Sequence, residues 1–352
     1  MLGGNNTIKR NLGLLFSVSI FLFFAACRHE EFDYFKVVES VDEKEVVFQE
    51  QEGLLLPPIR GMAVYDSLLV LCHPEYNRLF SVISINTGKL ITQWGHRGHG
   101  KGEYTSVSGN IQVYDGKLVF SANGGNLFFA SLADIIEEKP DVRVVQEPVP
   151  RRRSFRPGKV GVLNDSIRVV VGSFDEGYFG LYRVPDAIIH HGIGYPFTVD
   201  ERIGPLDRGS VYQGKLNVNA KKSRFALTLL CSDVFEIYEW DGKSVECVRP
   251  SRPLHLPVVR ERGGRYGVEF SESMAGIGKM SVSDSLICLR YSRDMYSNEK
   301  GYRRYSTLFF DWEGNKVKKI SFPFNVTDFC IDNEWFYGLE QSDELIIWRF
   351  RI

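Results

Sequence analysis

The chain has 352 residues, of which 43% are hydrophobic and 13% aromatic, so it can bury a large core and disorder of the bulk of the chain is excluded. The 43 lysines and arginines nearly balance the 44 aspartates and glutamates, and the formal net charge is −1. Because nucleic-acid-binding proteins usually carry a strong basic excess, we expect no nucleic acid partner.

The first 26 residues form an export signal by composition. Lys9 and Arg10 precede an apolar run of 15 residues, "LGLLFSVSIFLFFAA", which is too short to span a membrane as a helix. The following "FAAC" resembles the lipobox of bacterial lipoproteins, in which the cysteine is lipidated and becomes the mature N-terminus. We therefore predict a signal peptide over 1–26 and a membrane anchor at Cys27, with an ordinary cleaved signal as the alternative.

Residues 27–42 are predicted to be a tether between the anchor and the folded domain. Their "RHEEFD" resembles the acidic export signal that sends lipoproteins of the Bacteroidetes to the cell surface, although a tether that merely begins with acidic residues fits equally well. The expected location is the cell envelope, as an outer-membrane lipoprotein that faces either the periplasm or the outside. Five further cysteines lie mostly in apolar runs, which favours buried thiols, and one disulfide is compatible with an oxidising compartment.

One short pattern recurs along the rest of the chain: an apolar strand, a polar break and a second apolar strand, as in "VYDSLLVL" at 64–71. The break returns at Asp66, Asp115, Asp165, Asp284 and Asp332, at intervals of 49, 50, 119 and 48 residues. The long interval is about two periods, and "LNVNAKKSRFALTLL" at 216–230 supplies the missing unit. Six units of this length are typical of propeller blades.

Each unit also contains a second hairpin with a glycine in its turn, as at 84–94, 238–248 and 309–320. Four strands per unit predict an all-β fold, a six-bladed β-propeller over 43–352. The last unit offers only three strands, so we expect "EKEVVFQE" at 43–50 to complete it and close the ring. Short helices are expected at 130–139 and 184–191.

These features together resemble the TolB-like six-bladed propeller lipoproteins of the Bacteroidales, a BF-type family of unknown function. In addition, "WGHRGHGKGEY" at 94–104 is similar to the glycine-rich loop of NHL-type repeats, although later blades do not repeat it. No helix is expected after this loop, so a blade connection is favoured over a nucleotide-binding loop. The resemblance implies a fold and a location, and no activity.

The longer loops of the predicted blades share one face and are rich in arginine, whereas the short aspartate turns lie at the other face. Ligand sites usually lie on long loops, and an arginine cluster suits an anionic partner. The alternative is that these arginines are solvated charges that point apart. The candidate binding residues are those expected at the loop-rich mouth: Arg60, His73, His96, Arg97, Arg156, Asp233 and Arg293.

No motif predicts a cofactor, a metal site or a catalytic residue. His73, His96 and His99 share a face but no helix or carboxylate fixes them as metal ligands. The favoured function is a membrane-anchored, non-catalytic binding or scaffolding module whose partner is an envelope protein, a peptide or an anionic glycan. The alternatives are a carbohydrate-active hydrolase or lyase, which needs a close pair of titratable groups with displaced pKa values, and a purely structural blade stack.

Overall fold

The computed structural model describes residues 32, 35–41, 44–49, 56–149, 157–172, 174, 177–184, 187–191, 194–297, 304–322, 324, 326–341 and 345–352. The chain divides into two compact units, Met1–Lys36 and Val37–Ile352. The signal peptide, Cys27 and the start of the predicted tether lie outside the described residues.

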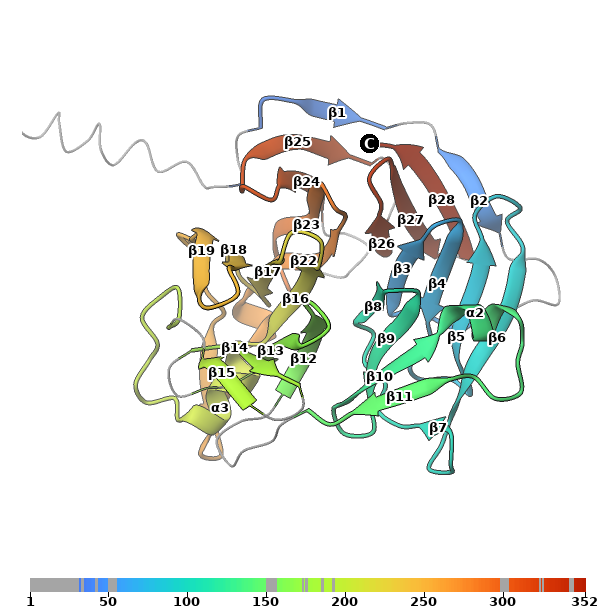
Figure 1. Cartoon of the computed structure of the whole chain (residues 1–352). Helices are drawn as coiled ribbons and strands as arrows, with labels where there is room; N and C mark the ends of the chain where they lie inside the picture. Colours follow the sequence, from blue (N-terminus) through green and yellow to red (C-terminus); the bar gives the residue numbers. More distant parts are fainter. Residues whose placement is uncertain are drawn as a thin grey trace, which may run out of the picture. The chain divides into compact units, whose positions relative to one another are not determined.

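Six antiparallel sheets, each of at least four strands, form the second unit, and their first strands gather around a common centre (Figure 1). The first sheet contains β3 (Gly61–Tyr65), β4 (Leu68–Cys72), β5 (Arg78–Ser84), β6 (Leu90–Arg97) and a short parallel β7 (Glu103–Tyr104). The second contains β8 (Ile111–Tyr114), β9 (Lys117–Ala122), β10 (Asn126–Ser131) and β11 (Val144–Glu147). The third contains β12 (Pro157–Val162), β13 (Ile167–Gly172), β14 (Phe179–Arg183) and β15 (Ala187–His191).

The remaining three blades continue the ring. The fourth contains β16 (Gly214–Asn219), β17 (Arg224–Leu229), β18 (Phe235–Trp240) and β19 (Val245–Arg249). The fifth contains β22 (Met274–Val282), β23 (Leu286–Met295), β24 (Ser306–Asp311), β25 (Lys316–Ser321) and an outer β1 (Val38–Ser40). The sixth contains β26 (Asp328–Ile331), β27 (Trp335–Gln341), β28 (Leu345–Arg351) and an outer β2 (Glu45–Gln49). The predicted six-bladed propeller is confirmed.

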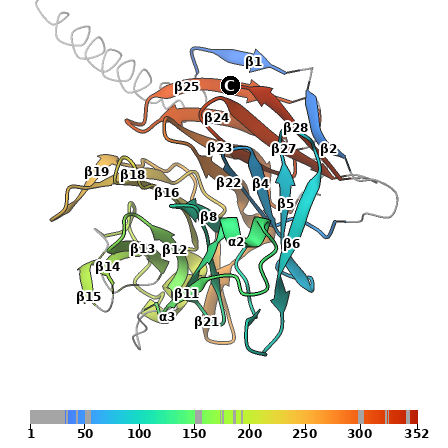
Figure 2. The same cartoon turned by 45° about the vertical axis from the view of Figure 1, so that its right-hand side comes forward.

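The ring closes as the sequence predicts, because β2 pairs antiparallel with β28 and so completes the last blade (Figure 2). Phe48 and Val47 on this strand are buried against Leu71 of the first blade and Ile347 of the last. This N-terminal strand therefore joins the two ends of the chain through both hydrogen bonds and apolar burial.

Two predictions, one about the start of the propeller and one about the type of an element, are wrong. The boundary between tether and propeller lies before residue 43, because β1 pairs in parallel with β25, Val38 opposite Lys319. Residues 187–191 form β15, not a helix, because they provide the outer edge of the third blade beside β14. The helix expected at 130–139 is confirmed as α2 (Leu132–Ile136), whose first turn is capped by the Ser131 hydroxyl.

Other elements lie in the connections: α3 (Pro205–Val211), the 3₁₀ turn η1 (Phe270–Glu272) and a separate hairpin of β20 (Val259–Arg262) and β21 (Arg265–Val268). The core consists of apolar clusters between neighbouring blades, such as Phe80 of the first blade against Phe120 of the second, at a ring-centroid distance of 4.8 Å. Burying both faces of each sheet in this way is what a single four-stranded unit could not do alone.

The inner strands of the first two blades approach so closely that glycine is required. A Cβ on Gly61 would lie 1.9 Å from the carbonyl oxygen of Gly109. No side chain fits into this space, so the pair sets the separation of the first two blades on the side away from the aspartate turns.

Candidate functional site

A cavity lies on the propeller axis, at the end where the inner strands turn into the second strands of the blades. Its volume is about 810 Å³, and residues from all six inner strands line it. Two of the turns are tight because their first residue adopts a left-handed conformation: Asp66 and Asp115 both have φ of 49°. Asp115 is followed by Gly116, also at positive φ, and this Asp-Gly pair is typical of a two-residue hairpin. The short turns keep this end of the channel open.

Carboxylates and amides dominate the rim of this cavity, which we call the aspartate mouth. Its lining has five carboxylate side chains against two cationic ones. The acidic residues are Asp66, Asp115, Asp284, Asp332 and Glu334, the amides are Asn86, Asn110, Gln112, Asn217, Asn219 and Asn333, and the cationic residues are Lys221 and Arg349. Lys117 and Arg351, outside the lining, also pair with Asp115 at 3.2 Å and with Glu334 at 3.9 Å. The excess of carboxylates in the lining still favours cationic groups.

The carboxylates of the aspartate mouth differ in how far the protein neutralises them. Lys221 Nζ lies 2.6 Å from Asp284 Oδ2, and the Asn333 amide donates to the same oxygen. Burial alone would raise the pKa of Asp284, but these two partners outweigh burial, and its pKa is lowered. Asp66 is exposed and makes no side-chain hydrogen bond or ion pair with another described residue. One side of the mouth thus offers a carboxylate that is available to a ligand.

The sixth blade contributes an aromatic and cationic wall. The Arg349 guanidinium stacks over the Trp335 ring at 4.4 Å and forms two hydrogen bonds to Glu45 of the closing strand β2, at 2.9 and 2.7 Å. These hydrogen bonds lower the pKa of Glu45. The Tyr337 hydroxyl donates to Asp332 Oδ2 at 3.0 Å. Ring closure and the cavity wall therefore share residues.

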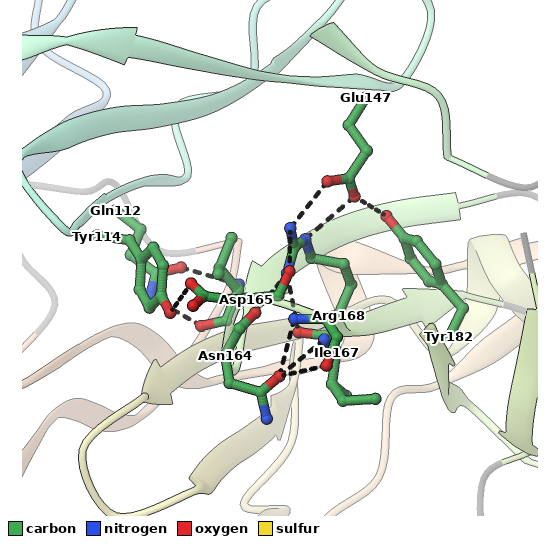
Figure 3. A network of polar contacts seen from close by, with 10 residues as sticks. Gln112, Tyr114, Glu147, Asn164, Asp165, Ile167, Arg168 and Tyr182 are labelled. Carbon is green, nitrogen blue, oxygen red and sulfur yellow. Dashed lines mark hydrogen bonds and ion pairs between the residues drawn. The ribbon is translucent and has the colours of Figure 1, made fainter. Parts of the chain in front are cut away.

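A polar network at the boundary of the second and third blades fixes the third turn (Figure 3). The Tyr114 hydroxyl donates to Asp165 Oδ1 at 2.8 Å, and burial, followed by this neighbouring carboxylate, raises the pKa of Tyr114 to about 12. The Gln112 side chain exchanges hydrogen bonds with the backbone of Val162 at 3.0 and 3.2 Å. Asp165 is thereby held by the neighbouring blade and is absent from the cavity lining.

Behind this turn lies a buried ion pair. Arg168 is 5% exposed and binds Glu147 through two hydrogen bonds, Nε to Oε1 at 3.0 Å and Nη2 to Oε2 at 2.8 Å. Its Nη1 also donates to the carbonyl oxygens of Asn164 and Ile167, and the Tyr182 hydroxyl donates to Glu147 (Figure 3). The guanidinium thus ties the outer strand of the second blade to the turn of the third.

Three of the residues predicted to bind a ligand come together at the opposite, loop-rich end. Arg60 Nη2 lies 3.6 Å from Glu75 Oε1, and Arg97 Nη1 donates to the Glu75 carbonyl oxygen at 2.7 Å. His96, beside Arg97 on β6, places its Nε2 atom 2.7 Å from Nη1 of Arg78 on β5. The cations here are thus engaged with groups of the same blade.

The other predicted residues do not join them. His73 and Asp233 are buried at 0% and 3% exposure, so the expectation that they lie accessible at a mouth is wrong. The His73 ring is held between the Pro57 carbonyl oxygen and the Ser81 hydroxyl, and burial lowers its pKa. Burial raises the pKa of Asp233, against the effect of two backbone amides that donate to it. Arg293 is exposed on β23, and Arg156 lies outside the described residues.

The arginines of the long loops do not form one basic rim within the described part of the chain. Several are paired with carboxylates nearby in the fold: Arg260 with Glu272, Arg262 with Glu269, Arg265 with Asp207 and Arg202 with Asp200. The alternative of dispersed charges describes these residues better than a convergent anion site.

The glycine-rich loop at 95–104 folds around its own acid. Glu103 Oε2 accepts a hydrogen bond from the Gly100 amide at 2.8 Å, and a Cβ on Gly98 would lie 1.9 Å from this same oxygen. Tyr104 packs against Trp94 and Phe120. Because a carboxylate already occupies the loop, it is a blade connection and does not cradle a phosphate.

The thiols and histidines form no metal centre in the part of the chain that the structure describes. Cys72, Cys231, Cys288 and Cys330 are buried free thiols, as the apolar runs predict, whereas Cys247 is an exposed free thiol. No helix among the described residues has the length and apolar character needed to cross a membrane.

The comparisons with known proteins agree with the fold. The TolB-like 6-blade propeller-like family matches residues 38–334. BF0058 of Bacteroides fragilis, described as an exported protein, is 11% identical, with a TM-score of 0.55 over 90% of this chain and 99% of that one. A member of the DUF4221 family from Bacteroides vulgatus is 10% identical, with a TM-score of 0.56 over 89% and 97%. No curated protein matches the sequence. From its six blades and the family match over most of its length, the chain belongs to the TolB-like six-bladed propeller family.

Proposed function

We propose that the protein is an exported, lipid-anchored binding module that takes a cationic group of a peptide or of an envelope protein into the aspartate mouth. The observation that carries this proposal is the cavity of about 810 Å³ on the propeller axis, lined by five carboxylates and only two cations. The sequence predicts a ligand site on the long loops, whereas this cavity lies at the short turns. An anionic glycan is a poor partner for this end of the channel.

Stacking and amide groups supply the remaining contacts. Tyr65, Tyr114 and Trp335 offer aromatic faces, which attract cations through their ring quadrupole. Arg349 already covers part of Trp335, so the two tyrosines are the better candidates for a ligand cation. The amides around the rim can accept further hydrogen bonds from ammonium or guanidinium groups.

Catalysis by a hydrolase or lyase is the less favoured alternative. A general acid needs a pKa raised towards neutrality, whereas the pKa of Asp284 at the mouth is lowered by Lys221 and Asn333. A carboxylate held in its charged form suits binding of a cation.

Trilysine amide, which has three side-chain ammonium groups, an N-terminal ammonium group and no carboxylate, tests the binding proposal. Trp335 lines the cavity, so its fluorescence should change on titration at low salt, and Trp335→Phe should abolish the signal. Asp66→Asn/Asp115→Asn should weaken binding about threefold to tenfold, since two exposed charge contacts are lost. Asparagine tolerates the left-handed conformation of both positions, so the fold is kept.

The matched control is Asp141→Asn/Glu246→Gln, which removes two exposed carboxylates outside the cavity lining. If the affinity for trilysine amide were unchanged in the Asp66→Asn/Asp115→Asn variant, or fell equally in the control, the peptide would not bind at the aspartate mouth.

The anchor is tested separately by cell fractionation. Cys27→Ala should release the protein from membranes, and Cys247→Ala, which removes the exposed thiol of the propeller, should leave it there. The sequence of residues 1–27 supports this part of the proposal, as does the description of BF0058 as an exported protein. Retention of the Cys27→Ala variant on the membrane would contradict it.

A further inference from the structure

Beyond the residues that line the aspartate mouth, three lysines lie on consecutive inner strands. Lys159 on β12 and Lys279 on β22 each stand three residues before the end of their strand, and Lys215 on β16 stands four residues before the end of its strand. At about 3.3 Å per residue, they lie about 10–13 Å from the turns of the aspartate mouth. The same level of the next blade carries Asp328 on β26. We call Lys159, Lys215, Lys279 and Asp328 the lysine cluster.

The lysine cluster has three ammonium groups but only one carboxylate to balance them. Lys279 Nζ pairs with Asp328 Oδ1 at 2.7 Å. The ammonium groups of Lys159 and Lys215 make no hydrogen bond or ion pair with another described residue, and both side chains are only partly buried. Arg290, opposite Lys279 in the neighbouring strand, adds a further cation and stacks on Tyr305 at 3.8 Å. Among the described residues, the three lysines of the cluster thus share one carboxylate.

The titration behaviour of the lysines reflects this imbalance. Burial, followed by the positive charges of Lys159 and Lys279, lowers the pKa of Lys215 to about 7. Burial, followed by the charge of Lys279, lowers the pKa of Lys159 to about 8. Groups that repel each other in this way are stabilised when an anion is placed among them.

A buried hydroxyl beside the cluster also lacks a partner. Thr228 is directly opposite Lys215 in the antiparallel pair of β16 and β17, which places the two side chains on the same face of the sheet. Thr228 is 0% exposed, and its Oγ1 has no hydrogen-bond partner among the described residues. Buried polar atoms are normally satisfied, so an acceptor is expected within its reach.

We propose that the lysine cluster is a second binding site, in which Lys159 and Lys215, supported by Lys279, hold a small anion through its oxygen atoms. The ligand chemistry is that of an inorganic oxyanion or of a carboxylate. This inference goes beyond the proposed function, because it concerns a group of opposite charge at a different depth of the channel. Loss of either site leaves the other intact.

Isothermal titration calorimetry with sodium sulfate and with sodium acetate tests the proposal, at constant ionic strength set with sodium chloride. Both anions keep their charge between pH 6.5 and 9.5. The wild-type protein should show saturable binding of at least one of them at pH 6.5. Affinity should fall about tenfold or more at pH 9.5, because Lys159 and Lys215 then lose their protons. A preference for sulfate indicates an oxyanion site, and a preference for acetate indicates a carboxylate site.

Two buried thiols near the cluster keep their protons in this pH range. Cys72 and Cys330 feel the charges of Lys279 and Asp328, and burial raises the pKa of both thiols, to about 12 for Cys72. The guanidinium of Arg290 stays charged throughout. The pH dependence therefore reports the two lysines.

Lys159→Met and Lys215→Met should each abolish saturable binding, whereas Lys101→Met, in the exposed glycine-rich loop, should leave it unchanged. The proposal would be overturned if the wild-type protein showed no saturable binding, or if the variant with both Lys159→Met and Lys215→Met still bound the anion. A second measurement does not depend on the variants: with ¹³C-labelled lysine, saturating sulfate or acetate should raise the pKa of Lys215 by about one unit or more. An unchanged titration with both anions would also overturn it.

Discussion

The buried pair of Arg168 and Glu147 gives the sharpest energetic prediction of the fold. Arg168→Met removes two hydrogen bonds to Glu147 and at least two to the carbonyl oxygens of the third turn. Among the side chains of the described residues, Glu147, which is 9% exposed, then keeps only the hydrogen bond from the Tyr182 hydroxyl at 3.2 Å. Leaving a buried charge without its counter-ion costs about 3–5 kcal/mol, so the free energy of unfolding should fall by this amount.

The assay is urea unfolding followed by circular dichroism, in a double-mutant cycle with Glu147→Leu. The double variant leaves neither charge unpaired, so it should lose clearly less stability than the sum of the two single variants. Arg202→Met is the matched control, because Arg202 forms a similar pair with Asp200 but is 77% exposed at its side chain. We expect that variant to lose about 1 kcal/mol or less. A loss of the same small size in Arg168→Met, or simple additivity in the cycle, would refute the reasoning.

Three further predictions concern the ring itself. Lys215 has a native pKa of about 7 against 10.5 in the unfolded chain, so the unfolded state holds the extra proton between these values. This difference should raise the free energy of unfolding by about 2 kcal/mol from pH 7 to pH 9, and Lys215→Met should remove that part of the rise in urea titrations and leave the smaller part due to Lys159, whose native pKa is about 8; an unchanged slope would contradict it. Gly61→Ala should lower the free energy of unfolding by more than about 3 kcal/mol, because the new Cβ would collide with the backbone carbonyl of Gly109. The control Gly267→Ala meets nothing within 4 Å and should lower it by about 1 kcal/mol or less. Equal melting temperatures of the two variants would rule out the close approach. Phe48→Ala should cost about 3–5 kcal/mol, as for other buried aromatic side chains, and should speed hydrogen exchange in β28; protection unaltered there would argue against closure by β2.

The number of blades and the closing strand could be predicted from sequence because both depend on repetition. A polar break about every 49 residues marks each inner turn, and the shortage of one strand in the last unit points to residues 43–50. Short segments without a repeat were less informative. Residues 187–191 contain apolar residues compatible with helix or strand, and only pairing with β14 decides between them. The three residues of β1 are too few to show any alternation, so they looked like tether.

The site could be predicted only in part. The sequence separates an acidic face from an arginine-rich face, and this separation of aspartate turns and long loops is present. The sequence does not show that arginines such as Arg265 pair with acids such as Asp207, far along the chain. It also hides the lysine cluster, because Lys159, Lys215 and Lys279 lie in different repeats. Aligning the repeats on their turns would have placed all three at nearly the same depth.

We infer that ligands bind inside the channel, on the side of the aspartate turns, and not on the long loops. A crystal structure of the wild-type protein grown with trilysine amide and sodium sulfate tests it most directly. We expect peptide density beside Asp66 and Asp115 and a sulfate between Lys159 and Lys215. Density for both molecules at Arg60 and Arg97, with the channel left to solvent, would contradict it.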